Sequence, residues 1–113
     1  MIITKNEPFT EEEIKRLREQ FDIYIKTVID TEEKICSAGC DRHFESEQLL
    51  LQQGSKQHDI WGGGIDLETK SIDYNSFINI RPTEGNTSSE IQNEQRRVKF
   101  ETLSKYFFQK IYE

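Results

Sequence analysis

The sequence has few cysteines, no long apolar run and no surplus of basic residues, and each shortage excludes a class of protein. Its two cysteines in 113 residues exclude a disulfide framework, so we expect a reduced, cytoplasmic setting. Three consecutive leucines at residues 49–51 are far too few to cross a membrane. With 15 basic and 21 acidic residues the net charge is −6, which disfavours general binding to nucleic acid or to an anionic membrane.

Glycine and proline are also scarce, eight residues together, while aromatic residues make up 11% of the chain. This balance is typical of an ordered protein rather than of a linker. Residues 1–8 lack a basic segment followed by an apolar stretch, so no secretory signal is expected. At this length we expect one domain spanning residues 1–113, with one modest core.

The beginning of the chain predicts a short strand at residues 1–4 and then a helix. Thr10 is a suitable N-cap, and Glu13 three residues later completes a capping box. Phe9 and Ile14 have the spacing of a hydrophobic staple. Ile14 also begins a stripe at helical spacing, so one buried face is expected.

Residues 23–30 alternate and are rich in β-branched side chains, which predicts a strand, followed after a turn by a second strand at 34–38. The alternative, a single helix over 10–38, is disfavoured by the β-branched residues. Asp41 is a candidate cap for a helix that ends at Gly54.

Residues 58–81 predict a hairpin. In its first strand Trp61, Ile65 and Leu67 share one face, and the glycines at 62–64 permit a bulge or a close backbone approach. The second strand, 72–81, alternates until Pro82 ends it. Ser89 and Gln92 form a second capping box, which predicts a C-terminal helix with an apolar stripe. The stripe comprises Phe100, Leu103, Phe107 and Ile111, widened by Tyr106 and Tyr112.

Together these elements predict an α+β fold. We expect an antiparallel or mixed sheet of four to five short strands, packed by the N-terminal and C-terminal helices.

Metal binding and cysteine chemistry are the first functional hypotheses. Cys36, Cys40 and His43 have a Cys-x3-Cys-x2-His spacing, with His58 as a candidate fourth ligand. Zinc sites usually present tighter, paired ligands, and small buried thiols explain the cysteines as well. No signature of a cysteine nucleophile surrounds either residue. We therefore expect no metal site and no cofactor.

Acid–base chemistry is a second hypothesis, because Asp30, His43, Asp59 and Arg81 all fall at predicted strand ends or loop edges. A His–Asp pair beside an arginine suits an anionic substrate if the residues converge; surface salt bridging is the alternative. The segment 81–89, which leads into the last helix, is a candidate anion-binding loop through Arg81 and free backbone N–H groups. Glu84 and Glu90 oppose that hypothesis, and helix capping explains the serines.

Several motifs resemble a family of small prokaryotic proteins catalogued only as a domain of unknown function. They are Gly-Ser-x-Gln-x-Asp-x-Trp-Gly at residues 54–62, Ile-Asn-Ile-Arg-Pro at 78–82, Gly-Asn at 85–86 and Glu-Ile at 90–91. Shorter likenesses lie at residues 28–30 and 39–43. The resemblance implies a single α+β domain and supplies no activity. The polar residues in its pattern are Asp30, His43, Gln57, Asp59, Trp61, Asn79, Arg81 and Asn86.

This chain departs from the family pattern at three places. Phe44-Glu45 stands where the family tends to have Ala-Asp, Gly64 where it has Asn, and Thr87 where it has a basic residue. The missing basic residue counts against the anion-binding hypothesis, and neither cysteine belongs to the pattern.

We expect a non-enzymatic module that binds a small ligand or a protein partner through a polar ledge. The ledge would consist of His43, Trp61, Asn79, Arg81 and Asn86. One alternative is a small hydrolase or nuclease that uses His43 with Asp30 or Asp59, so whether the chain is an enzyme stays open. Another is one member of an operon-encoded pair, such as a toxin–antitoxin system. For Trp61, a purely structural place in the core is the main alternative to a place in the site.

Overall fold

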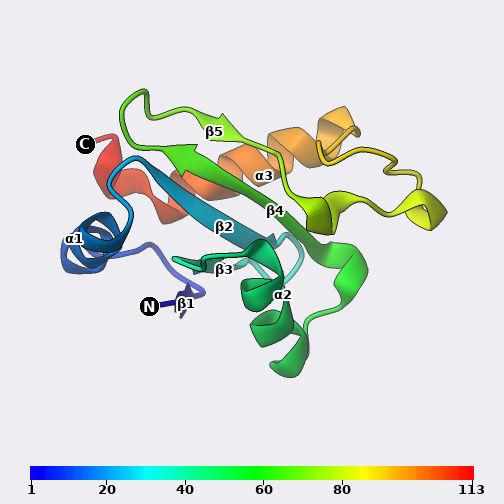
Figure 1. Ribbon diagram of the computed structural model, residues 1–113, viewed down its shortest axis with the longest axis horizontal. Helices are drawn as coiled ribbons and strands as arrows, with labels where there is room; N and C mark the ends of the chain where they lie inside the picture. The colour runs from blue at the N-terminus through cyan, green and yellow to red at the C-terminus, as the bar shows by residue number, and fades with distance from the viewer.

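The computed structural model describes residues 1–113 and contains five antiparallel strands and three α-helices (Figure 1). The predicted α+β class is confirmed, and the sheet is antiparallel throughout rather than mixed. Its strand order is β1-β3-β2-β4-β5. The strands are β1 (Ile3–Lys5), β2 (Tyr24–Asp30), β3 (Ile35–Ala38), β4 (Ile60–Asp66) and β5 (Ile72–Asp73), and the helices are α1 (Glu11–Gln20), α2 (His43–Gln52) and α3 (Glu94–Phe107).

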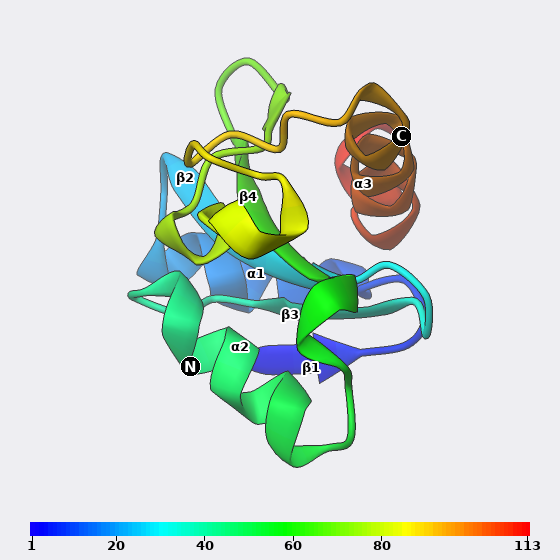
Figure 2. The same ribbon diagram turned by 90° about the vertical axis from the view of Figure 1, so that its right-hand side faces the viewer.

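The main core lies on the face of the sheet that carries α1 and α3, as predicted. Alternating residues of β2 and β4, such as Ile25, Ile29 and Ile65, pack there with Leu17 of α1 and Phe100 of α3. The opposite face carries α2, which sequence analysis did not place on the sheet, and Figure 2 shows α2 and α3 on either side of it. A smaller cluster of Val28, Leu50 and Ile60 forms under α2.

The capping predictions for α1 are confirmed. Thr10 Oγ1 accepts a hydrogen bond from Glu13 N–H, and Glu13 Oε1 accepts one from Thr10 N–H. Phe9 and Ile14 both belong to the main core, as a hydrophobic staple requires. α2 differs in detail from its prediction, because Arg42 rather than Asp41 is the N-cap and the helix ends at Gln52. No helix of the protein combines the length and the apolar character that a membrane span needs.

The three glycines of β4 give the sheet its close packing. The register between β2 and β4 runs unbroken from Tyr24↔Asp66 to Asp30↔Ile60, so the close approach is confirmed and no bulge is present. A Cβ at Gly63 would overlap the carbonyl oxygen of Asp73 and the ring of Phe100. α3 and β5 therefore lie against bare backbone at this position.

The prediction of a second hairpin strand over 72–81 is wrong beyond Asp73. The chain leaves the sheet after two paired residues and forms short 3-10 helices at Phe77–Asn79 and Pro82–Glu84. Ser76 Oγ accepts a hydrogen bond from Ile78 N–H, which turns the backbone out of the strand conformation. In Figure 1 this irregular segment between β5 and α3 extends beyond the end of the sheet.

The predicted capping box at Ser89 and Gln92 is also wrong. α3 begins four residues later, with Asn93 as N-cap accepting a hydrogen bond from Arg96 N–H. Residues 89–91 instead pair with the chain after β5, through Ser76 N–H to Ser89 O and Ile91 N–H to Tyr74 O. Those backbone bonds hold the segment extended and delay the helix.

We predict that Gly63→Ala lowers the free energy of unfolding by about 2–4 kcal/mol, because the added methyl group must displace backbone and a core ring. Urea denaturation measures the change. Gly85→Ala is the matched control: Gly85 has open space around its Cβ position and a φ of +83°. It should lose only about 1 kcal/mol, from backbone strain. Equal losses in the two variants would show that β4 does not pack as described.

Candidate functional site

Asn79 is fully buried beside the outer edge of β4, where a longer β5 would otherwise have paired. Its Oδ1 accepts a hydrogen bond from Gly62 N–H at 2.9 Å, and its Nδ2 donates to Gly62 O at 2.9 Å. The same Nδ2 lies 3.0 Å from the carbonyl oxygens of Tyr74 and Ser89. One side-chain amide thus replaces a strand residue and joins three segments of backbone.

Asn86 has a similar role in the following loop. Its Nδ2 lies 2.8 Å from the carbonyl oxygens of both Asn79 and Glu90, and its Oδ1 accepts a hydrogen bond from Gln92 N–H. Its backbone pairs with that of Arg81 in both directions. With an exposed fraction of 1%, Asn86 has no polar atom left for a ligand.

Arg81 is buried, and backbone carbonyl groups occupy its guanidinium. Nε donates to Ile78 O, Nη1 to Gln57 O at 2.7 Å, and Nη2 to Ile60 O. Nη2 also lies 3.5 Å from the buried carboxylate of Glu47 in α2. Burial lowers the pKa of Arg81, and the carboxylate of Glu47 opposes that shift. An alanine at Arg81 would therefore remove bonds that hold the fold, so it is not a clean test of binding.

Trp61 lies in the main core with an exposed fraction of 1%, as the structural alternative requires. Its Nε1–H donates to His58 O. The guanidinium carbons of Arg81 and Arg96 lie 4.3 and 4.2 Å from the ring centroid, within the range of cation–π interactions. The ring thus connects the irregular segment to α3.

The structure brings Trp61, Asn79, Arg81 and Asn86 together, but it buries them. Their polar atoms bond to backbone groups, so these four residues do not form an exposed ledge. In the proposed anion-binding loop, Arg81, Glu84, Gly85 and Asn86 all donate their N–H groups to carbonyls within the loop. His43 is the one ledge residue that lies elsewhere.

His43 is the first residue of α2 and is partly buried. Its Nε2 lies 2.7 Å from Gly63 O, and because a carbonyl oxygen can only accept, Nε2 carries the proton. Burial lowers the pKa of His43, with a further decrease from Lys26 and an opposing increase from the Gly63 hydrogen bond and Asp73. The ring is therefore neutral at pH 7, and Nδ1 is an acceptor that has no partner in the protein.

A hollow of about 400 Å³ opens beside His43, between the start of α2 and the first 3-10 helix of the irregular segment. Its apolar walls are Phe44, Phe77 and Ile78, and its polar lining is Lys26, Asp41, Arg42, His43 and Ser76. The two phenylalanine residues are 51% and 87% exposed. A hollow of this size and composition is suited to a small ligand.

Asp30 and Asp59 do not join His43. Asp30 Oδ1 accepts hydrogen bonds from Glu32 N–H and Glu33 N–H, and Asp59 lies 3.4 Å from His58. Asp30 pairs with Ile60, three residues along β4 from Gly63, a separation of about 10 Å. The structure therefore does not form the acid–base pair of the hydrolase alternative.

Cys36 lies in the main core, whereas the thiol of Cys40 lies beside Ser46. Both are free and buried, and burial raises the pKa of each thiol. No group of three or more His, Cys, Asp or Glu side chains is placed to hold a metal ion.

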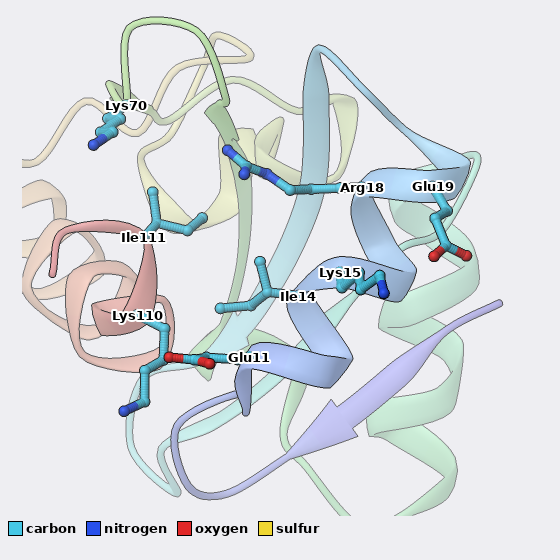
Figure 3. A pocket seen from close by; sticks show the side chains of 8 residues that line it. All are labelled: Glu11, Ile14, Lys15, Arg18, Glu19, Lys70, Lys110 and Ile111. Carbon is cyan, nitrogen blue, oxygen red and sulfur yellow. The ribbon is translucent and has the colours of Figure 1, made fainter.

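A second hollow, of about 480 Å³, lies between α1 and the C-terminal residues (Figure 3). Six of its eight lining residues are charged, and only Ile14 and Ile111 are apolar. Figure 3 shows Arg18 reaching across it while Lys15 and Glu19 lie to one side. Because most of its lining is charged, it offers a ligand less apolar contact than the hollow beside His43.

Sequence analysis missed Lys26, Phe44, Phe77 and Glu47. Phe77 gave a usable signal, because it was an apolar residue on a predicted strand face otherwise made of Asp, Asn and Arg. Glu47 gave none, since only the packing of α2 places it near Arg81.

Comparison with known proteins identifies the family. A family model described as "Protein of unknown function (DUF5674)" matches residues 1–107. The chain belongs to this family. The match ends at the last residue of α3, so it covers all five strands and all three α-helices. It confirms the expected likeness to a family of unknown function. No curated protein and no solved structure matches the chain.

We predict that Asn79→Asp lowers the free energy of unfolding by about 3 kcal/mol or more, because a carboxylate cannot donate to the three carbonyl groups and is buried as a charge. Thermal and urea denaturation measure the loss. Asn75→Asp is the control, because Asn75 is exposed in the same segment, and should change stability by less than about 0.5 kcal/mol. A stable Asn79→Asp variant would contradict the role assigned to the amide.

Proposed function

We propose that this protein is a non-enzymatic binding module whose site is the hollow beside His43. Its ligand is a small planar molecule that carries a negative charge. The observation that carries the proposal is the pair of exposed phenylalanines, Phe44 and Phe77, on one hollow of about 400 Å³.

The apolar walls favour a planar ligand. Phe77 is 87% exposed although its neighbours Ser76 and Asn79 are buried, so its ring is available for contact. Clustered exposed apolar side chains with a polar rim are typical of interaction sites. Aromatic rings add favourable stacking to the area that they bury.

The charges of the rim favour an anion. Lys26 and Arg42 line the hollow, and neither forms an ion pair within the protein, whereas Asp41 is the only acidic lining residue. This is a local positive excess in a chain with a net charge of −6. A carboxylate, sulfonate or phosphate on the ligand would find two cations at the rim.

The buried polar residues have a structural role in this proposal. We infer that the motifs at residues 54–62 and 78–82 are a structural signature of the family, since Asn79 and Arg81 bond to the backbone of Gly62 and Ile60. Residues 1–113 then form one domain around the main core. The two free thiols support a reduced, cytoplasmic setting.

The test uses 1-anilinonaphthalene-8-sulfonate, an anionic dye that offers a flat naphthalene ring and a sulfonate and whose fluorescence rises on binding. The folded wild-type protein should bind one dye molecule, and Phe77→Ala should weaken binding about tenfold through the loss of ring contact. Lys26→Gln should also weaken it, by a smaller factor, through the loss of a charge.

Val98→Ala is the matched control, because Val98 is 61% exposed on α3, away from the hollow. It should bind the dye like the wild type, and circular dichroism should show that all variants are folded. Unchanged binding in Phe77→Ala would overturn the proposed site. If Val98→Ala weakens dye binding as much as Phe77→Ala does, the binding site lies on α3 instead.

A further inference from the structure

We infer that the ligand of this hollow presents an N–H or O–H donor to Nδ1 of His43, beside the anionic group that the rim cations bind. The inference rests on the proposed function, because it assigns a recognition role within the same site. It narrows the ligand class from planar anions to planar anions that carry a hydrogen-bond donor.

The tautomer of His43 is set by the backbone. Gly63 O accepts a hydrogen bond from Nε2–H, so the neutral ring presents a lone pair at Nδ1. Gly63 lies in the middle of β4, paired with Thr27, and cannot move without disturbing the sheet. The imidazole is therefore held in one orientation by a rigid element, as a recognition group requires.

The Nδ1 atom is free as well as oriented. No hydrogen bond within the protein uses it, and it is not fully buried, so a ligand can reach it. His43 lines the hollow together with its sequence neighbours Arg42 and Phe44. A ligand that fills the hollow and covers Nδ1 leaves this acceptor unpaired unless the ligand presents a donor, and an unpaired buried acceptor is unfavourable.

The polar groups of the hollow then complement one ligand pattern. Lys26 and Arg42 are donors and cations, while His43 Nδ1 is a neutral acceptor. A planar molecule with an anionic group at one position and a ring N–H or hydroxyl at another satisfies both. A planar anion without a donor leaves Nδ1 unpaired.

The experiment compares two probes of nearly the same shape, indole-3-carboxylate and 1-benzothiophene-3-carboxylate, in which sulfur replaces the ring N–H. Each is titrated into ¹⁵N-labelled protein, and the amide shifts of residues 41–44 and 76–78 give the affinity. We expect indole-3-carboxylate to bind about five- to tenfold more tightly, and this preference to vanish in His43→Phe. His58→Phe is the control, since His58 is an exposed histidine outside the hollow, and should keep the preference.

The outcomes separate the two proposals. If both probes shift the residues of the hollow with equal affinity, the donor inference is wrong and the proposed site stands. If neither probe shifts them, the proposed function fails and the inference with it. A preference that survives in His43→Phe also overturns the inference. Equal affinity of the two probes for the wild type overturns the inference even if His43→Phe does not fold.

Discussion

The side chain of Asn79 closes the outer edge of β4, and the rest of the irregular segment depends on that contact. Gly62 both donates to this amide and accepts from it, as it would with a neighbouring strand. An exposed edge of this kind invites pairing with another chain. Here a buried amide satisfies it, so the chain after Asp73 can leave the sheet and fold back as short 3-10 helices before α3.

Around this contact the protein gathers polar side chains that bond to backbone. Asn86 fixes the loop that follows Asn79, and Arg81 joins the start of β4 to Glu47 of α2. Trp61 stacks with Arg81 and Arg96, which brings α3 into the same assembly. Because their polar groups bond to backbone, the polar residues of the motifs at 54–62 and 78–82 can lie in the core. His43, bonded to the next glycine of β4, is the one residue of the predicted ledge that lines the hollow.

Sequence patterns predicted correctly those features that depend only on residues close together in the chain. The capping box at Thr10 and the alternation of residues 23–30 needed no distant partner, and both predictions hold. The alternation of residues 72–81 was equally regular, yet the strand stops after Asp73, and Asn79 then bonds to β4 through its side chain. Ser89 and Gln92 had the spacing of a capping box, but Ser89 O pairs with Ser76 N–H. Burial of Arg81 and Asn86 was not predictable, because their partners are carbonyl groups that any residue carries.

A side chain, not a strand, holds the edge of β4, and hydrogen exchange of the Gly62 amide measures how firmly it does so. Gly62 N–H donates to Asn79 Oδ1 inside the core, so we predict protection comparable to that of the amides in β2. Exchange of Gly62 N–H as fast as that of the exposed Thr83 N–H would show an open edge and would contradict the role assigned to Asn79.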